Sequence, residues 1–280
     1  MASFSNKIGI MQGRLLPESL DRLQVFPVSN WAKEPELARS LGFQCFELLY
    51  DQEYKLRQLL NSTSSRSQLG LFCGSEGKNE RIKTTSVCLD FLTQVSFWPK
   101  ETSTIFLSEL CTAIADFKDS NVSILVVPFC GLNDVITPSD LAEVLSFIQS
   151  NRLDQLACES GLSLALELDL PAAIVVKEFN KFEFSNVGIC LDLGNTRAAG
   201  LIPEEEILLL SNLIIHLHLK DRSVGGPNVM FGDGQVDFSA CFKSLREIDY
   251  RGQCVMESRY FSDPTFEASS NLKYIKKVSS

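Results

Sequence analysis

The sequence predicts an α/β protein in which eight parallel strands alternate with helices and close into a (β/α)8 TIM barrel. Apolar, β-branched runs repeat along the chain, and segments with helical spacing separate them. Strands that are apolar almost throughout indicate a parallel sheet with both faces covered. The 280 residues suit this architecture, because such a barrel typically takes ~250 residues. An open, doubly wound sheet is the alternative.

The expected strands are short runs rich in valine, isoleucine and leucine. They cover residues 7–11, 44–49, 83–89, 123–127, 163–168, 188–191, 213–217 and 253–256.

The expected helices are amphipathic and lie between these strands. They cover residues 30–41, 102–119, 138–160, 203–210, 238–248 and 265–278. Asn30 is a suitable cap and Pro138 suits a first helical turn, while Gly42 and Gly161 follow helix ends. The Ser-rich residues 61–81 fit a helix, a loop or both. No Pro/Gly/Ser linker divides the chain, so we expect one domain over residues 1–280.

Composition and charge narrow the class of protein. Lysine and arginine number 26 and aspartate and glutamate 35, which gives a net charge of −9. This balance, with no basic tail or stripe, argues against a nucleic-acid partner, although a few local cations could still hold one small phosphate. No run of about 18 apolar residues occurs, so we expect no membrane-spanning segment. The N-terminus also lacks a signal-peptide core, which favours a cytoplasmic protein.

The 9 cysteines are scattered singly, and none forms a C-x-x-C pair. Several lie inside apolar runs. We therefore expect small buried thiols in a reducing compartment rather than disulfides or a thiolate zinc site.

The only two histidines, His216 and His218, lie in one strand pattern and therefore point to the same side of the sheet. Glu167, Asp192 and Glu257 end other apolar runs. Glu167, Asp192 and His218 follow one another at 25 and 26 residues, close to one βα repeat. Successive strands should therefore bring these side chains to the same mouth of the barrel.

Together, Glu167, Asp192, His218 and Glu257 form an oxygen-rich set with one nitrogen. This set suits one Mn²⁺ or Mg²⁺, tolerates Co²⁺ or Zn²⁺, and leaves positions for water or substrate. Each member alone also fits a satisfied structural role, but burying three carboxylates close together is costly without a cation. We prefer His218 as the ligand because it is nearer the strand end, and we expect His216 behind it.

An ordered series of short motifs runs through nearly the whole chain. The series comprises Met11-Gln12-Gly13-Arg14, Gln24-x-Phe26-Pro27, Glu47, Cys88-Leu89-Asp90, Glu167-Leu168-Asp169, Asp192-Leu193-Gly194-Asn195, His216-x-His218-x-Lys220-Asp221-Arg222, Gly232-x-Gly234 and Glu257-x-Arg259. With these motifs the chain resembles the sugar-phosphate isomerase/epimerase family of the xylose isomerase-like TIM barrels.

The resemblance implies that Glu167, Asp192, His218 and Glu257 bind one divalent metal. It also implies a mouth that holds a ketose, a ketose phosphate or a related polyol. The chain departs from relatives that act on free ketoses, because Asn195 and Ala173 stand where those relatives carry His and Glu.

Our mechanistic hypothesis is an isomerase that abstracts a proton next to a carbonyl and passes through an enediolate. Glu167 and Glu257 are the predicted catalytic groups. If both act, from opposite faces, the carbon is epimerised; if one carboxylate moves the proton between neighbouring carbons, an aldose and a ketose interconvert.

The expected substrate-binding groups lie past the strand ends. Arg14, Lys220, Arg222 and Arg259 suit a phosphate or carboxylate, unless they pair with neighbouring acids. The set is completed by Gln12, Glu47, Asn195 and His216. The glycines at 225–226 and 232–234 fit either a lid or tight turns.

Three other functions are compatible with parts of the pattern. An inosose-type dehydratase could use the same metal cage, and a non-catalytic sugar-binding barrel needs no chemistry. A barrel endonuclease would need many histidines and a basic groove, which this chain lacks. The expected ligand is thus a small sugar, with neither nucleic acid nor membrane as partner, and a homo-oligomer remains open.

Overall fold

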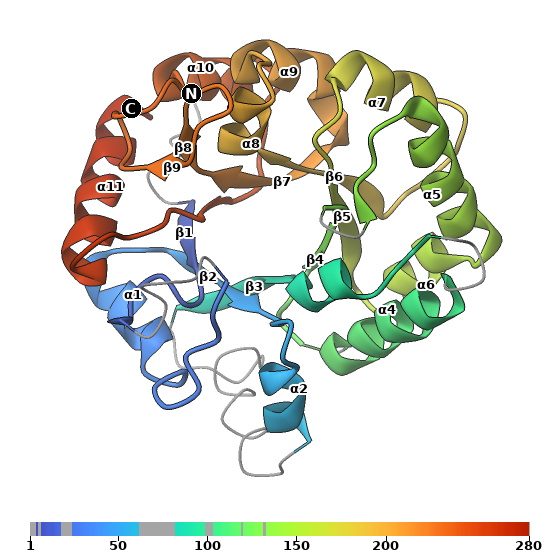
Figure 1. The fold of residues 1–280 in the computed structure, drawn as a ribbon, viewed down its shortest axis with the longest axis horizontal. Coiled ribbons are helices and arrows are strands. Elements are labelled where there is room, and N and C mark those ends of the chain that lie inside the picture. The colour runs from blue at the N-terminus through green and yellow to red at the C-terminus, as the bar shows by residue number, and fades with distance from the viewer. Residues whose placement is uncertain are drawn as a thin grey trace.

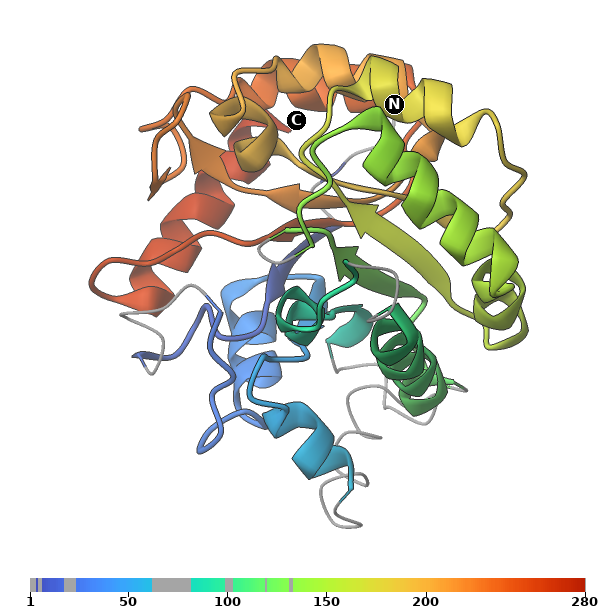
Figure 2. The same ribbon diagram turned by 45° about the vertical axis from the view of Figure 1, so that its right-hand side comes forward.

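The computed structural model describes residues 4, 7–17, 24–61, 82–98, 103–118, 120–130 and 133–279. Eight parallel strands form a closed barrel in the order β1-β10-β7-β6-β5-β4-β3-β2, and helices surround it (Figure 1). Figure 2 shows the strands running through the middle of the helical ring. The predicted (β/α)8 barrel is confirmed, and the open sheet is wrong because β1 pairs with both β2 and β10.

Every predicted strand is present, with ends that shift by one or a few residues. The barrel strands are β1 (Ile8–Met11), β2 (Cys45–Leu49), β3 (Lys83–Cys88), β4 (Ile124–Pro128), β5 (Ser163–Glu167), β6 (Val187–Asp192), β7 (Ile214–Leu219) and β10 (Cys254–Met256). A short antiparallel pair, β8 (Asp221–Arg222) and β9 (Asn228–Val229), follows β7.

The helices that cover the barrel are α1 (Glu34–Leu41), α2 (Lys55–Leu60), α4 (Ser103–Phe117), α5 (Pro138–Ser150), α6 (Leu153–Glu159), α7 (Ala172–Phe179), α8 (Leu193–Ala198), α9 (Pro203–Leu210), α10 (Phe238–Glu247) and α11 (Pro264–Val278). Two 3-10 turns, η3 (Asp90–Gln94) and η6 (Ser211–Leu213), join them. Residues 62–81, which make up nearly all of the Ser-rich segment, lie outside the described residues.

Two helix predictions were wrong in detail. The first helix starts at Glu34 instead of Asn30, because Pro35 occupies the first turn, where its missing N–H costs nothing. Its predicted end is confirmed, since Gly42 adopts a left-handed φ of 95°. The helix predicted over residues 138–160 is two helices, because Arg152 has a φ of 55° and breaks the helical path between α5 and α6.

Apolar side chains form two layers. A large outer layer packs between the strands and the helices. A small inner layer fills the barrel and consists of Met11, Leu49, Cys88, Val126, Ala165, Cys190 and Val255. Three polar side chains share this interior: Glu47, His216 and His218 pair in register with Met11, Cys190 and Val255.

The loop that follows β9 is tied to Asp221. The buried carboxylate of Asp221 accepts hydrogen bonds from the backbone N–H groups of Gly232, Gly234 and Val236, at 2.8, 3.1 and 3.2 Å. A Cβ at Gly234 would lie 2.1 Å from Asp221 Oδ1, so this position requires glycine. Gly232 and Gly234 therefore lie in a loop that hydrogen bonds fix to Asp221. This arrangement fits tight turns rather than a lid.

Two further sequence predictions concern the cysteines and membrane-spanning segments. The described cysteines, from Cys45 to Cys254, are all free, and Cys73 lies outside the described residues. Among the described residues, no helix combines the length and the apolar character needed to span a membrane.

A candidate metal centre at the mouth of the barrel

Strand register brings the four predicted ligands together. Asp192 pairs with His218, and one step deeper Cys190 pairs with His216. His218 is also level with Val255, so Glu257 emerges two residues further along the next strand, on the same side. Glu167 ends β5 beside Cys190. Side chains from β5, β6, β7 and the end of β10 thus converge inside the barrel, at the C-terminal ends of the strands.

The donor atoms of Glu167, Asp192, His218 and Glu257 all lie within 4.8 Å of one another. His218 Nδ1 is 3.0 Å from Glu257 Oε2 and 3.8 Å from Glu167 Oε1. Asp192 and Glu257 are almost fully buried, whereas the Glu167 side chain is 14% exposed. The space between them is therefore approached from the side of Glu167.

The donor atoms fit a divalent cation. His218 Nε2 is hydrogen-bonded to Glu47 Oε1 at 2.9 Å, and because a carboxylate can only accept, the imidazole donates there. The neutral ring then carries its lone pair on Nδ1, which faces two carboxylates. Among the described residues, His218 Nδ1 is buried without a hydrogen bond. Such a convergence of lone pairs is costly unless a cation or a proton lies between them.

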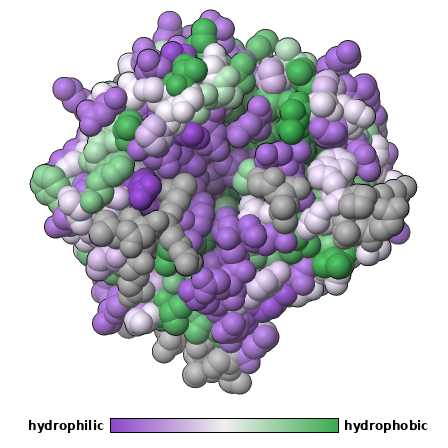
Figure 3. Space-filling view, viewed as in Figure 1, coloured by the Kyte–Doolittle hydropathy of each residue, from purple (hydrophilic) through white to green (hydrophobic). Residues whose placement is uncertain are grey.

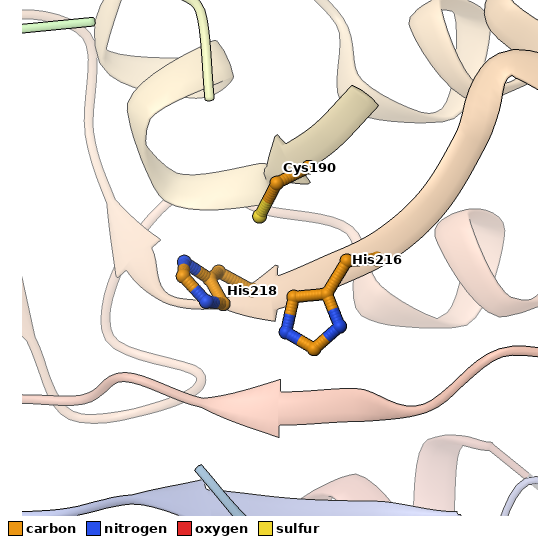
Figure 4. A group of neighbouring side chains, drawn as sticks. All are labelled: Cys190, His216 and His218. Carbon is orange, nitrogen blue, oxygen red and sulfur yellow. The ribbon is translucent and has the colours of Figure 1, made fainter. Parts of the chain in front are cut away.

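A second cluster, Cys190, His216 and His218, lies one layer below (Figure 4). Cys190 projects from β6 toward the two rings of β7. Burial raises the pKa of the Cys190 thiol to about 12, so the sulfur stays protonated at neutral pH. Both Nε2 atoms are engaged by Glu47, at 2.7 and 2.9 Å. This cluster is therefore packing beneath the site and not a second metal centre.

Glu47 supports the site from below. Its carboxylate is fully buried and contacts both histidines. Burial alone would raise its pKa, but His218 and His216 hold that pKa below its usual range. A carboxylate behind a ligating imidazole fixes the tautomer and the orientation of the ring.

We expect Glu47→Gln to weaken metal binding by about 10- to 100-fold, because the amide cannot accept from both histidines and orient His218. Titration of the metal-free protein with Mn²⁺, followed calorimetrically, measures this change. The matched control is Glu178→Gln, a buried glutamate on α7 that pairs with Lys181, away from the site. Equal affinities in the two variants would contradict the role given to Glu47.

Four cations had been expected to reach a substrate, namely Arg14, Lys220, Arg222 and Arg259, but two of them pair with acids of the cage. Lys220 Nζ lies 2.6 Å from Asp192 Oδ2 and 3.0 Å from Glu257 Oε2, and the residue is 4% exposed. Arg14 Nη2 lies 3.5 Å from Glu257 Oε1. Arg222 is half-buried.

Glu257 is therefore held on both sides. Gln24 donates to Glu257 Oε1 at 2.7 Å and accepts from Arg14 Nη2 at 2.7 Å. Burial alone would raise the pKa of Glu257, but Lys220, His218 and Arg14 lower it below its usual range. Burial likewise opposes the charge on Lys220, but Asp192 and Glu257 outweigh it and raise the pKa of the ammonium group.

The remaining predicted substrate groups lie at different depths. Arg222 donates to Asn195 Oδ1 at 2.9 Å and to the carbonyl of Gly226 at 2.9 Å, which joins two half-buried residues at the mouth. Arg259 is exposed at the end of β10. Figure 3 shows hydrophilic residues around a hollow in the middle of this face.

Gln12, Glu47 and His216 lie deeper than the mouth, and their contact with a substrate stays a prediction. Gln12 and Glu47 are 0% exposed and His216 is 1% exposed. Gln12 Oε1 accepts from the backbone of Leu49 at 3.2 Å. Glu47 precedes the end of its strand by two residues, and His216 lies two residues below His218, so both belong to the layer beneath the mouth.

Two residues near the site were missing from the predicted set. Gln24 lies in a loop, where no periodicity reports its direction. Asp90 follows β3 and is 5% exposed, and its Oδ2 has no hydrogen bond to a described residue. Burial, and then the charge of Glu257, raise the pKa of Asp90 to about 7. Both residues belong to the short motifs described above, and these motifs are the sequence signal that indicates a place near the site.

Known proteins share this fold. A family model described as "Xylose isomerase-like TIM barrel" matches residues 172–278. The L-ribulose-5-phosphate 3-epimerase UlaE of Escherichia coli (strain K12) is 24% identical over 258 residues, which cover 88% of this chain and 89% of UlaE.

Two solved structures extend the comparison. D-allulose 3-epimerase from Methylomonas sp. in complex with D-allulose has a TM-score of 0.72 at 17% identity, covering 97% of this chain and 96% of that one. The IOLI protein with a bound zinc atom has a TM-score of 0.69 at 18% identity, covering 98% and 96%. The chain is therefore similar in sequence and fold to the sugar-phosphate isomerase/epimerase family of the xylose isomerase-like TIM barrels, as the motifs predicted.

Proposed function

We propose that this protein is a divalent-metal-dependent epimerase or isomerase of a ketose or ketose phosphate. The observation that carries the proposal is the convergence of Glu167, Asp192, His218 and Glu257, whose donor atoms lie within 4.8 Å of one another. Three carboxylates and one imidazole suit Mn²⁺ or Mg²⁺ and also accept Co²⁺ or Zn²⁺. The zinc atom in the IOLI structure and the sugar named for the D-allulose 3-epimerase complex point in the same direction.

A bound divalent cation would polarise the substrate carbonyl and acidify the neighbouring C–H. The proton is then transferred by the carboxylates of this chain. Glu167 and Glu257 come from β5 and from the end of β10, on different sides of the cage. With both groups in reach of one carbon, one removes the proton and the other returns it to the opposite face, which is epimerisation.

The two carboxylates differ in how firmly they are held. Glu257 contacts Gln24, Arg14 and Lys220, at 2.7, 3.5 and 3.0 Å. Among the described residues, the Glu167 carboxylate is within ion-pair distance of His218, at 3.8 Å, and the side chain is 14% exposed. In the proposed reaction Glu257 is the fixed group, and Glu167 is the group that adjusts to the substrate from the open side.

Arg222 and Asn195 are the proposed specificity pair. They lie at the mouth, joined by a hydrogen bond of 2.9 Å. Arg222 makes one further hydrogen bond, from Nε to Gly226, so part of its guanidinium still faces the mouth. A guanidinium in this position suits a phosphate or a hydroxyl-rich end of the substrate. Because Arg14 and Lys220 pair with carboxylates, we assign a phosphate to Arg222.

The test is proton exchange in D₂O. The Mn²⁺-loaded protein is incubated with ketoses, ketose phosphates and inososes, and deuterium at the carbon next to the carbonyl is followed by NMR. Deuterium together with an epimeric or isomeric product is the expected result. Loss of water from the product would identify the dehydratase instead. A metal-loaded protein that exchanges no proton with any substrate would leave a sugar-binding barrel and refute the proposal.

A further inference from the structure

Lys220 is the one lysine placed inside the candidate metal centre by the contacts that the structure shows. Its Nζ lies between the carboxylates of Asp192 and Glu257, at 2.6 and 3.0 Å, in a residue that is 4% exposed. The ammonium group is thus held by two carboxylates of the centre. This arrangement points to a role beyond the substrate clamp that its position after β7 suggested.

The backbone holds Lys220 in this place. Asp192 is the N-cap of α8, and its Oδ1 accepts from the Asn195 N–H at 2.8 Å, which leaves Oδ2 for Lys220. Gly194, in the first turn of α8, lies against Lys220 so closely that an added Cβ would come within 2.7 Å of Lys220 Cβ. Any larger residue at position 194 would push the two elements apart. The close approach of α8 and the end of β7 thus fixes the ammonium beside Asp192.

The connected network carries an excess of negative charge. Contacts of 3.8 Å or less join four carboxylates through the two histidines, Lys220 and Arg14, and these carboxylates are Glu47, Glu167, Asp192 and Glu257. With neutral imidazoles, the two basic side chains balance two of the four negative charges. A divalent cation would offset the remaining charge of these contacts.

We propose that Lys220 is a built-in cation that positions Asp192 and Glu257 and limits this centre to one divalent ion. The proposal rests on the metal-binding function proposed above. In sites that hold two metal ions, the ions lie about 3.5–4 Å apart. Here the ammonium group occupies the side of the Asp192–Glu257 pair on which a second ion would bind. Lys220 is thus a positioning residue, which acts on the substrate only through the carboxylates it holds.

The test counts Mn²⁺ ions per chain, by calorimetric titration of the metal-free protein and by electron paramagnetic resonance of the unbound ion. The native protein should bind one ion. Lys220→Met, which keeps the length and removes the charge, should bind two, because Asp192 Oδ2 and Glu257 Oε2 become free together. Arg14→Met removes the same charge from the other side of Glu257 without freeing Asp192, and should still bind one.

The outcomes separate the two proposals. If the native protein binds no Mn²⁺, the metal-dependent function itself fails. If the native protein binds one ion and a folded Lys220→Met also binds one, the role of Lys220 is wrong while the function stands. Should Lys220→Met not give the native circular dichroism spectrum, Lys220→Gln, which is neutral and shorter, provides the same count. Two ions bound by Arg14→Met would show that charge alone, and not the place of Lys220, sets the number, and would also overturn the proposal.

Discussion

Replacing Glu167 with glutamine is expected to lower kcat/KM by about 10³-fold, because the proton transferred from carbon loses its acceptor. The substitution keeps the size of a side chain that is 14% exposed and is held by an ion pair with His218 of 3.8 Å. We therefore expect the thermal unfolding midpoint of the metal-free variant to stay close to that of the native protein. Deuterium exchange in D₂O should be lost in parallel with turnover, and proton NMR measures both.

Glu257→Gln provides the comparison. Its carboxylate accepts from Gln24 and faces Lys220, so an amide must place its NH₂ group against one of these donors. This variant should lose turnover and also unfold at a lower temperature without metal. Glu178→Gln, remote from the site, should retain both properties. A Glu167→Gln variant with more than about a tenth of native turnover would contradict the proton-transfer role, since such a group contributes at least about 10²-fold.

Removal of the metal is expected to abolish turnover and to lower the unfolding midpoint by about 5–10 °C. An ion present at about 100 times its Kd stabilises the folded state by roughly 2.7 kcal/mol, and for a chain of this size 1 kcal/mol corresponds to roughly 2–4 °C. The physical reason is that, without the ion, three carboxylates and the His218 lone pair face one another in a largely buried space.

Differential scanning calorimetry with EDTA, followed by added Mn²⁺, measures the loss and its recovery. The matched control is His218→Asn, which removes the imidazole ligand and should unfold at the same temperature with and without Mn²⁺. If neither EDTA nor Mn²⁺ changes the thermal unfolding midpoint of the native protein, the centre holds no ion that stabilises the fold.

The cage could be predicted from the sequence because its members share a simple rule. Each of the three acids ends an apolar run, and the spacing between the first members matches one βα repeat. The structure brings these side chains to one end of the barrel by register, as in the pairing of Asp192 with His218. The same rule gives no depth, which is why Glu47 was expected at the mouth. Two further residues of β2 follow Glu47, so the mouth of the barrel lies above its side chain.

The sequence also indicates the direction in which the Lys220 side chain points. Residues 216, 218 and 220 alternate along β7 and its end, so a lysine two residues after His218 should point inward as the histidines do. The position of Lys220 just past β7 suggested a cation available to a substrate. The alternation of side chains along the strand instead predicts a buried lysine. Gln24 had no such indicator, because it reaches Glu257 from a loop that is 233 residues away in sequence. Contacts of this kind depend on the closed fold rather than on local pattern.

The pairing of β1 with β10 sets the order in which the centre can form during synthesis. Ile8, Gly9 and Ile10 pair with Cys254, Val255 and Met256, so the ring closes only after nearly the whole chain has left the ribosome. Glu257 follows that last strand directly. Glu167, Asp192 and His218 are therefore synthesised before Glu257. An ion can be bound by all four side chains only after the barrel has closed.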